Sequence, residues 1–480
     1  MIIKSKIIDQ QVICQKQQNI FFYFAPKYLF TLLLLVWSLN TSAQELKRIS
    51  SKGIQLAPLS SEQLASMNLT AGMRVHKVIP GFTAAEIGVK DGDVIISIND
   101  VVLETPQKLL LPELNLRGGD SIKYEVLRNK EKLTLQGRCI PNPFETSEKF
   151  DVEYSSFPFQ NGYIRSIYLK PKTKGKKPAI LFIPGYTCAS VDNLNETNVY
   201  HKLLYGLAQK GYVVMRAEKP GVGDSKGTPD CSDIDFMTEV ESFRTALEEL
   251  KKHPEVDTNN IFIFGHSMGG MEAPFVADGH QVKGIIAMGI TIKNWCEYLT
   301  EMLRVQNPNL GVDYLQHEKD MKLYQALLYE LLVLKKKPSE MIKINPEYLR
   351  LLKRDFNYAG GDDFLTRNIL FSQTLNDINI AKKWINTSAK VLSVWGETDI
   401  QTVGSFSHVE LVKMINQYHP DNATLLILEN TDHSFRIFPS MEESYKFNYN
   451  QETFMKYLHA FNYKAVDDVD KWMRSVMVTK

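Results

Sequence analysis

Residues 260–270 read Asn-Ile-Phe-Ile-Phe-Gly-His-Ser-Met-Gly-Gly, an apolar run that stops at Gly265 and sets Ser267 between two glycines. This G-x-S-x-G pattern predicts a buried strand, a tight turn and a helix, with the serine at the turn. A side chain at Gly265 or Gly269 would not fit, because Ser267 must adopt a strained conformation that exposes its hydroxyl. The helix that follows offers an unpaired backbone N–H at Met268. So short a motif also arises by chance, so the rest of the sequence must decide whether Ser267 is a nucleophile.

The chain of 480 residues is long enough for two or three domains, and its content of 44% hydrophobic and 23% charged residues is that of a globular protein. The formal net charge is +1, with no basic stripe and no Cys/His cluster, so neither nucleic-acid binding nor a metal is expected. Residues 219–227 are rich in glycine but lack the strand–G-x-x-x-x-G-K-[ST]–helix setting of a phosphate loop. We therefore expect no cofactor.

The N-terminal residues 1–43 have the layout of a secretory signal peptide cleaved after Ala43. Residues 28–39 form an apolar core that follows Lys27 and precedes small residues. The alternative is a membrane anchor, but such a segment spans about 18 Å as a helix, short of the roughly 30 Å hydrocarbon core. We expect a secreted or periplasmic protein, with membrane contact only through residues 28–39 if the segment stays uncleaved.

Residues 44–142 are expected to form a small β-rich domain. Its short β-branched runs, separated by turn residues, predict strands over 73–79, 94–98, 121–127 and 132–136 and a helix over 106–114. Residues 78–95 (V-I-P-G-F-T-A-A-E-I-G-V-K-D-G-D-V-I) resemble the PDZ domain of bacterial secreted proteases, and the turns at 99–100 and 117–120 fit that family as well. The resemblance implies an α+β PDZ domain.

The resemblance to PDZ domains also implies a peptide-binding groove. Such domains bind the C-terminus of another protein as an added strand and hold its carboxylate with backbone N–H groups. The residues expected to form this groove are Leu69, Gly72, Met73, Arg74 and, on the opposite helical wall, Leu110. The alternative is that the domain packs on its neighbour and binds nothing.

From residue 143 to residue 480, apolar strands alternate with amphipathic helices. Strands are expected over 149–154, 163–170, 179–183, 212–217, 261–264, 284–289, 391–395 and 425–428, and helices over 198–210, 234–252 and 451–477. This alternation predicts a mostly parallel sheet covered on both faces, which resembles the α/β-hydrolase fold. An insertion over 295–387 lacks strand runs and includes a helical pattern over 321–335. In that family such an insertion forms a lid over the active site.

A nucleophilic serine needs a base that takes its proton and an acid that orients the base. In the α/β-hydrolase family they follow in the order Ser, acid, His. Residues 391–399 (V-L-S-V-W-G-E-T-D) match the family's strand-G-x-x-D pattern and offer Asp399 as the acid, while the loop after the last expected strand holds His433. The resemblance therefore implies a triad of Ser267, Asp399 and His433, with Glu397 as the alternative acid.

Three residues that lie near the expected triad residues in the sequence are expected to have other roles. His266 adjoins the nucleophile and is expected to point away from it as a structural residue. His408 lies in a helical stretch after the acid and is expected at the surface. Asp432 adjoins His433, but adjacent side chains point apart, so it is a poor candidate to orient the base.

The oxyanion of an acyl-transfer transition state requires two pre-aimed donors. One is the backbone N–H of Met268. Residues 184–188 (P-G-Y-T-C) correspond to the family's H-G-x segment, with Pro184 in place of the histidine. The expected second donor is the N–H of Tyr186, and Thr187 is the alternative.

Cys188 and Cys231 lie in loops that leave neighbouring strands at the same edge of the expected sheet. In an oxidising compartment a disulfide between them would stiffen the oxyanion loop. The alternative is two free thiols.

These features imply an exported serine hydrolase that cleaves carboxylic esters of a small-molecule or peptide acyl substrate. One alternative is an aminopeptidase-like enzyme on the same triad, which needs carboxylates for the substrate's amine, with Glu297, Glu301 and Asp313 as candidates. Another alternative is a binding protein whose PDZ domain captures protein C-termini beside a vestigial hydrolase.

Overall fold

The computed structural model describes residues 44–104 and 115–477. The leader predicted over residues 1–43 and the helix predicted over 106–114, which carries Leu110, lie outside this range. Across the described part of the chain, no helix combines the length and apolar character needed to cross a membrane.

The first of two large elements is an antiparallel six-stranded sheet, here called the small sheet. Its main path runs β1 (Ile54–Pro58), β2 (Met73–Val78), β3 (Val94–Ile98), β5 (Ser121–Arg128) and β6 (Glu131–Arg138), and β4 (Val101–Val102) pairs with β3. Helices α2 (Ser61–Ser66) and α3 (Thr83–Glu86) accompany it. Four of these strands lie where the sequence predicted them. Strand β1 was not predicted, because its five residues end in proline and show no clear alternation.

Strand β2 is paired along both edges, which contradicts the predicted peptide groove. Strand β1 pairs with it over its whole length, and β3 pairs with it at Met73 and Arg74. A peptide strand that starts at Arg74 would find that edge occupied. Gly72 and the Met73 side chain are buried, and Leu69 lies in the turn before the strand. The predicted addition of a peptide strand along β2 from Arg74 is therefore wrong, and the groove wall assigned to Leu110 lies outside the described residues.

The second element is an eight-stranded sheet, here called the large sheet, with strand order β16-β15-β12-β11-β9-β10-β8-β7. The strands are β7 (Phe150–Phe159), β8 (Gly162–Pro171), β9 (Lys177–Ile183), β10 (Val213–Ala217), β11 (Val256–His266), β12 (Gly284–Met288), β15 (Lys390–Gly396) and β16 (Ala423–Leu428). The hairpin β7–β8 joins antiparallel to β10, and the six other strands run parallel. The predicted mostly parallel sheet is confirmed.

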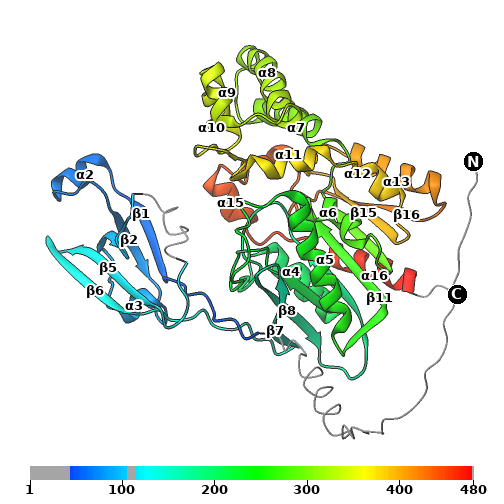
Figure 1. The fold of residues 1–480 in the computed structure, drawn as a ribbon, viewed down its shortest axis with the longest axis horizontal. Coiled ribbons are helices and arrows are strands. Elements are labelled where there is room, and N and C mark those ends of the chain that lie inside the picture. The colour runs from blue at the N-terminus through cyan, green and yellow to red at the C-terminus, as the bar shows by residue number, and fades with distance from the viewer. Residues whose placement is uncertain (1–43, 105–114, 478–480) are drawn as a thin grey trace, which may run out of the picture. The chain divides into compact units, whose positions relative to one another are not determined.

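Helices cover both faces of the large sheet (Figure 1), as its continuous apolar strands require. In β9, Ala179, Leu181 and Ile183 pack toward one core, while Ile180 and Phe182 pack toward the other. The first core holds α5 (Phe236–Lys252) and α6 (Met268–Ala277), and the second holds α4 (Val199–Gln209) and α16 (Lys464–Met477). The predicted C-terminal helix over 451–477 is divided into α15 (Gln451–Tyr457) and α16, because a β-bridge between Phe461 and Arg436 interrupts it.

The predicted lid is helical and lies between β12 and β15 in the chain. It contains α7 (Trp295–Asn309), α8 (Tyr314–Leu328), the π-helical turn η3 (Tyr329–Val333), α9 (Pro338–Ile344), α10 (Glu347–Asp355), α11 (Ile369–Asp377) and α12 (Ile380–Ile385). A two-residue hairpin, β13 (Asp363–Phe364) with β14 (Arg367–Asn368), was not predicted. After the lid come α13 (Phe406–Tyr418) and α14 (Met441–Lys446).

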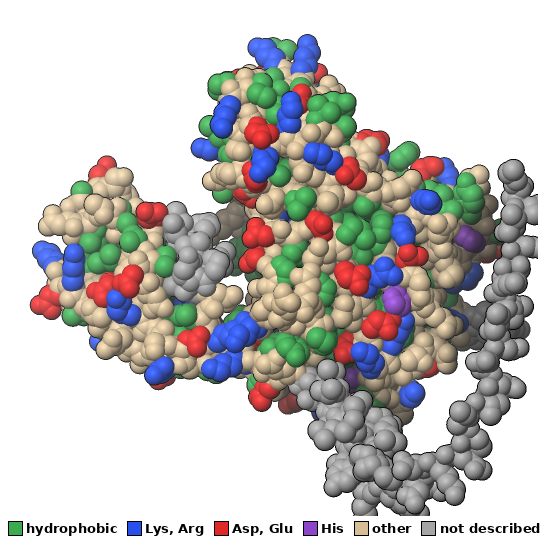
Figure 2. All heavy atoms as spheres, viewed as in Figure 1, with side chains coloured by type: hydrophobic (Ala, Val, Ile, Leu, Met, Phe, Trp, Pro, Cys, Tyr) green, Lys and Arg blue, Asp and Glu red, His purple; other side chains and the backbone are tan. Residues whose placement is uncertain are grey.

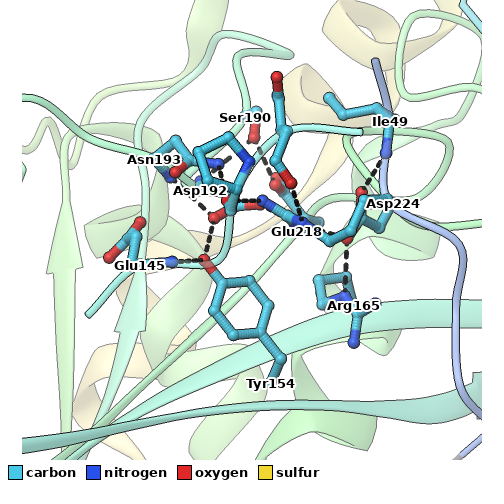
Figure 3. Close-up of polar contacts among 12 residues, drawn as sticks. Ile49, Glu145, Tyr154, Arg165, Ser190, Asp192, Asn193, Glu218 and Asp224 are labelled. Carbon is cyan, nitrogen blue, oxygen red and sulfur yellow. Dashed lines mark hydrogen bonds and ion pairs between the residues drawn. The ribbon is translucent and has the colours of Figure 1, made fainter. Parts of the chain in front are cut away.

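The chain segment 44–50 is joined to loops of the large sheet by a buried ionic cluster. Arg48 pairs with Asp192 and, at 2.6 Å, with Asp224. Figure 3 shows the backbone N–H of Ile49 and the guanidinium of Arg165 converging on the same Asp224, at 2.7 and 3.1 Å. Every charge in this cluster is matched, as burial demands.

Charged side chains of both signs are interspersed over the face of the molecule shown in Figure 2, with apolar groups between them. That face presents no extended basic surface, in agreement with the formal net charge of +1.

Candidate active site

Ser267 lies at the turn between β11 and α6 and has the strained backbone angles φ 55° and ψ −122°. Its N–H donates to Met288 O at 2.7 Å, which ties the turn to the neighbouring strand β12. A Cβ at Gly265 would collide with Gly269 O, and one at Gly269 would collide with Ile183 O. Both glycines are therefore required, for the reason that the sequence suggested.

His433 and Asp399 follow β16 and β15 and meet at the same edge of the large sheet. His433 Nδ1 lies 2.8 Å from Asp399 Oδ2. The other carboxylate oxygen of Asp399 accepts hydrogen bonds from Gln401 N at 2.8 Å and Thr402 N at 3.1 Å. Burial acts to raise the pKa of Asp399, but His433 and these N–H groups outweigh it and lower the pKa. The carboxylate is therefore charged and fixed in place.

The second ring nitrogen of His433 is available as a base. Within the described residues, the buried Nε2 has no hydrogen-bond partner. It is not hydrogen-bonded to Ser267 there, but both residues line one cavity. Burial opposes a charge on the imidazole, yet Asp399 outweighs burial and raises the pKa of His433. Catalytic contacts of this kind often tighten only when substrate binds.

His266 joins the loop of His433 to the loop that holds Tyr186. Its Nε2 donates to His433 O, since a carbonyl can only accept, and its Nδ1 accepts from the Tyr200 hydroxyl, both at 2.7 Å. The Tyr200 hydroxyl in turn accepts from Gly185 N at 3.3 Å. Burial lowers the pKa of His266 to about 3, so the ring stays neutral. The structural role predicted for His266 agrees with these contacts.

The other residues weighed from the sequence lie apart from the reacting atoms. His408 is fully buried, not at the surface as predicted, because α13 packs it against Ser393 Oγ at 2.8 Å. Glu397 accepts from Asn430 N at 3.0 Å instead of contacting His433. Asp432 accepts from the backbone N–H groups of 434 and 436 and shapes the loop.

Two backbone N–H groups beside Ser267 are free to bind an oxyanion. Neither Tyr186 N nor Met268 N donates a hydrogen bond to any described residue. Tyr186 and Met268 line the same cavity as Ser267, and so does the alternative donor residue Thr187. The assignment of these N–H groups as oxyanion donors stays a prediction.

Cys188 and Cys231 form a disulfide with their Cα atoms 5.8 Å apart. The bridge connects the loop after β9, which contains Tyr186, to the loop after β10. The predicted pairing is therefore the one that the structure contains. Cys139 and Cys296 are free thiols.

The cavity at Ser267 has a volume of about 330 Å³ and is mainly apolar. Among the described residues that line it, none is Asp, Glu, Lys or Arg, and His433 is the only histidine. Its large side chains come from the loop after β9, from α6 and from the lid helix α7: Tyr186, Met271, Trp295, Tyr298, Leu299 and Met302. The described lining therefore offers no Asp, Glu, Lys or Arg side chain that could pair with a charge on the bound group.

Gly289 is a site residue that the sequence analysis missed. It has φ +65°, and a Cβ there would lie 2.7 Å from both Cε1 and Nδ1 of His433. Only glycine leaves room for the imidazole at this point. The sequence signal that could have identified Gly289 was its place directly after a buried strand.

Comparisons with known proteins match parts of this chain. The family model described as serine aminopeptidase, S33, matches residues 190–376. Esterase EstD of Thermotoga maritima is 26% identical over 136 residues, which is 28% of this chain and 32% of that protein. Serine endoprotease DegS of Salmonella typhimurium is 31% identical over 84 residues, or 18% of this chain and 24% of DegS. The chain thus spans at most about a third of the length of these two relatives.

Solved structures of esterases resemble the chain over a longer range. Est1E from Butyrivibrio proteoclasticus aligns with 68% of this chain and 99% of its own, at 14% identity and a TM-score of 0.41. A carboxyl esterase from Bacillus coagulans gives 15% identity and the same coverage and TM-score. The family model and the EstD match support an α/β-hydrolase of the esterase kind.

Replacing Gly289 by Ala should lower the rate at which Ser267 reacts with a fluorophosphonate by about 100-fold, because the new methyl group displaces the imidazole. The measurement is the labelling rate of the purified variant. Gly311→Ala is the matched control, because Gly311 has a similar φ of +80° with nothing within 4 Å of the added Cβ. Equal labelling rates for the two variants would contradict the assigned place of His433.

Proposed function

We propose that this protein is a serine hydrolase that cleaves carboxylic esters through a covalent acyl-enzyme. The observation that carries the proposal is the His433–Asp399 pair at 2.8 Å. Among the described residues His433 Nε2 has no hydrogen-bond partner, and His433 lines the same cavity as the strained Ser267. A buried carboxylate, an oriented imidazole and a serine that lines a cavity are the groups that nucleophilic acyl transfer requires.

The proposed reaction follows from these positions. Ser267 Oγ attacks the acyl carbon while His433 Nε2 takes the hydroxyl proton, and Asp399 stabilises the imidazolium. The N–H groups of Met268 and Tyr186 bind the oxyanion of the tetrahedral intermediate. His433 then gives the proton to the leaving alcohol, and water hydrolyses the acyl-enzyme by the same steps.

In the described part of the chain, the carboxylates named for the aminopeptidase alternative lie away from the cavity at Ser267. None of its three candidate residues lines the cavity at Ser267. Glu301 pairs with Lys293, and with Glu297 it lies at a separate depression on the lid. Asp313 caps α8 by accepting from the backbone N–H groups of 315 and 316. An uncharged apolar acyl group therefore fits this site better than a free ammonium group.

The N-terminal parts add two further proposals. The PDZ-like motif over residues 78–95 supports a PDZ-type domain over residues 44–142. The signal-like leader and the disulfide Cys188–Cys231 support export to an oxidising compartment. A vestigial hydrolase is disfavoured because every group needed for acyl transfer is present.

Wild-type protein should be labelled by a fluorophosphonate and should cleave short neutral acyl esters faster than aminoacyl amides, whereas Ser267→Ala should do neither. The expected loss in ester hydrolysis is about 10⁴-fold or more. Product release and labelling stoichiometry are the measurements. Faster amide than ester turnover would favour the peptidase, and an unlabelled wild type would contradict the enzyme.

Ester hydrolysis should depend on pH through His433. The base must be neutral, and Asp399 raises its pKa, so kcat/KM should rise with pH and reach half its maximum above the ordinary value of 6.5. Asp399→Asn should shift this midpoint downward and lower kcat by about 10³- to 10⁴-fold. The measurement is a pH profile with a neutral ester. A wild-type midpoint at or below 6.5 goes against the assignment.

Full-length chain expressed in a secreting host should be recovered outside the cytoplasm with Gln44 as its first residue, because cleavage is expected after Ala43. N-terminal sequencing measures this. Retention of residues 28–39 in a membrane fraction would show that the segment is an anchor.

A further inference from the structure

Lys219 is a buried lysine directly behind the loop that holds Tyr186. It follows β10 and is 1% exposed. Its ammonium donates to Gly185 O at 2.7 Å and to Tyr186 O at 3.3 Å. Burying an ammonium group costs desolvation free energy, so the position of Lys219 against two backbone carbonyls indicates a functional role.

The hydrogen bond to Gly185 O sets the direction of the Tyr186 N–H. In a trans peptide the C=O of one residue and the N–H of the next point in opposite directions. With Lys219 on the carbonyl side, the N–H of Tyr186 must point away from the ammonium. Gly185 lies on Ser267, since a Cβ built on it would be 3.3 Å from Ser267 Cβ. The N–H of Tyr186 and the side chain of Ser267 therefore lie close together.

Counter-charges from two other segments hold Lys219 in place. Glu239 of α5 contacts the ammonium at 2.7 Å and, through its second oxygen, Arg367 at 2.6 Å. Arg367 belongs to the lid hairpin and donates to Tyr186 O at 3.3 Å and to Cys231 O at 2.8 Å. All three side chains are at most 1% exposed.

The cluster carries an excess of positive charge beside the oxyanion loop. Burial acts to raise the pKa of Glu239, but Lys219 and Arg367 outweigh it and lower the pKa, so this carboxylate is ionised. Burial and the neighbouring Glu239 raise the pKa of Glu272, which favours its neutral form. Two cations thus face one carboxylate in a region shielded from water.

The far end of the same loop is held by the residue that precedes Lys219. Glu218 accepts from the Ser190 hydroxyl at 2.5 Å, as Figure 3 shows, and from Val191 N at 3.1 Å. The disulfide of Cys188 fixes the loop at a further point, between the part bound by Lys219 and the part bound by Glu218. Among the described residues, Lys219 is the side chain that donates a hydrogen bond to the carbonyl of the Gly185–Tyr186 peptide.

We propose that Lys219, held between Glu239 and the loop carbonyls, is the positioning residue of the oxyanion hole. It fixes the Tyr186 N–H in the direction of the developing oxyanion, and Arg367 ties the same loop to the lid. This inference rests on the proposed ester hydrolysis at Ser267.

Lys219→Met keeps the length of the side chain and removes its donors. The variant should lower kcat for a short ester by about 10- to 100-fold and change KM less than about 2-fold, since the contact acts on the transition state. A trifluoromethyl ketone gives a second measurement. Ser267 Oγ adds to its carbonyl carbon, the C=O π bond becomes an oxyanion, and the proton passes to His433. Its inhibition constant should rise by the same factor as kcat falls.

Lys177→Met is the matched control. Lys177 is also buried, donates to the backbone Gly175 O at 2.9 Å and pairs with Glu255 at 3.0 Å, but it begins β9 at the opposite end of that strand. This control should lose stability and keep kcat and ketone affinity. If Lys219→Met does not fold, Lys219→Gln is used, and its kcat and ketone affinity should fall together by a smaller factor.

Wild-type kcat and ketone affinity in a folded Lys219 variant would overturn the inference, as would equal losses in the Lys177 control. A wild type that binds the ketone but cleaves no ester would contradict the proposed function alone. The ketone affinities of the variants would then still decide the role of Lys219.

Discussion

The strained backbone of Ser267 is the constraint on which the rest of the site depends. A serine with φ 55° and ψ −122° costs roughly 1–3 kcal/mol and persists only when its surroundings fix it. Those surroundings are the close contacts of Gly265 and Gly269 and the pairing of β11 with β9 and β12. The loops that carry Tyr186, Asp399 and His433 leave the same sheet at the same edge, so the strand order determines which groups can meet the hydroxyl.

Parallel topology explains why much of the site could be predicted. Ser267, Asp399 and His433 each follow an apolar strand, and carboxyl ends of parallel strands share one edge. Lys219 and Arg367 act through contacts with distant segments that local sequence pattern does not reveal, and Gly289 was marked only by its place directly after a buried strand. The same limit explains the wrong expectations for β2 and His408. Whether a strand edge is free, or a helix face buried, depends on which neighbour covers it, as β1 and the large sheet do here.

The titratable groups around the serine are buried, so their charge states depend on the partners that surround them. Asp399 is charged beside His433, Glu239 is charged between two cations, and His266 and His408 stay neutral with pKa values of about 3 and about 4. Each charge has a fixed partner, so little reorganisation is needed when an oxyanion forms. The apolar cavity then leaves substrate choice to shape and not to charge.

Arg48 has a consequence for how the chain could be divided. Its guanidinium bonds to Asn142 O at 3.2 Å and Pro143 O at 2.8 Å, as well as to Asp192 and Asp224. Arg48 thus holds together the segment that enters the small sheet and the segment that leaves it. Excising residues 44–142 would strip Asp192 of its buried cation, in the loop that begins at the oxyanion hole. Any division of the chain that preserves the loop of Tyr186 must therefore keep segment 44–50 together with the large sheet.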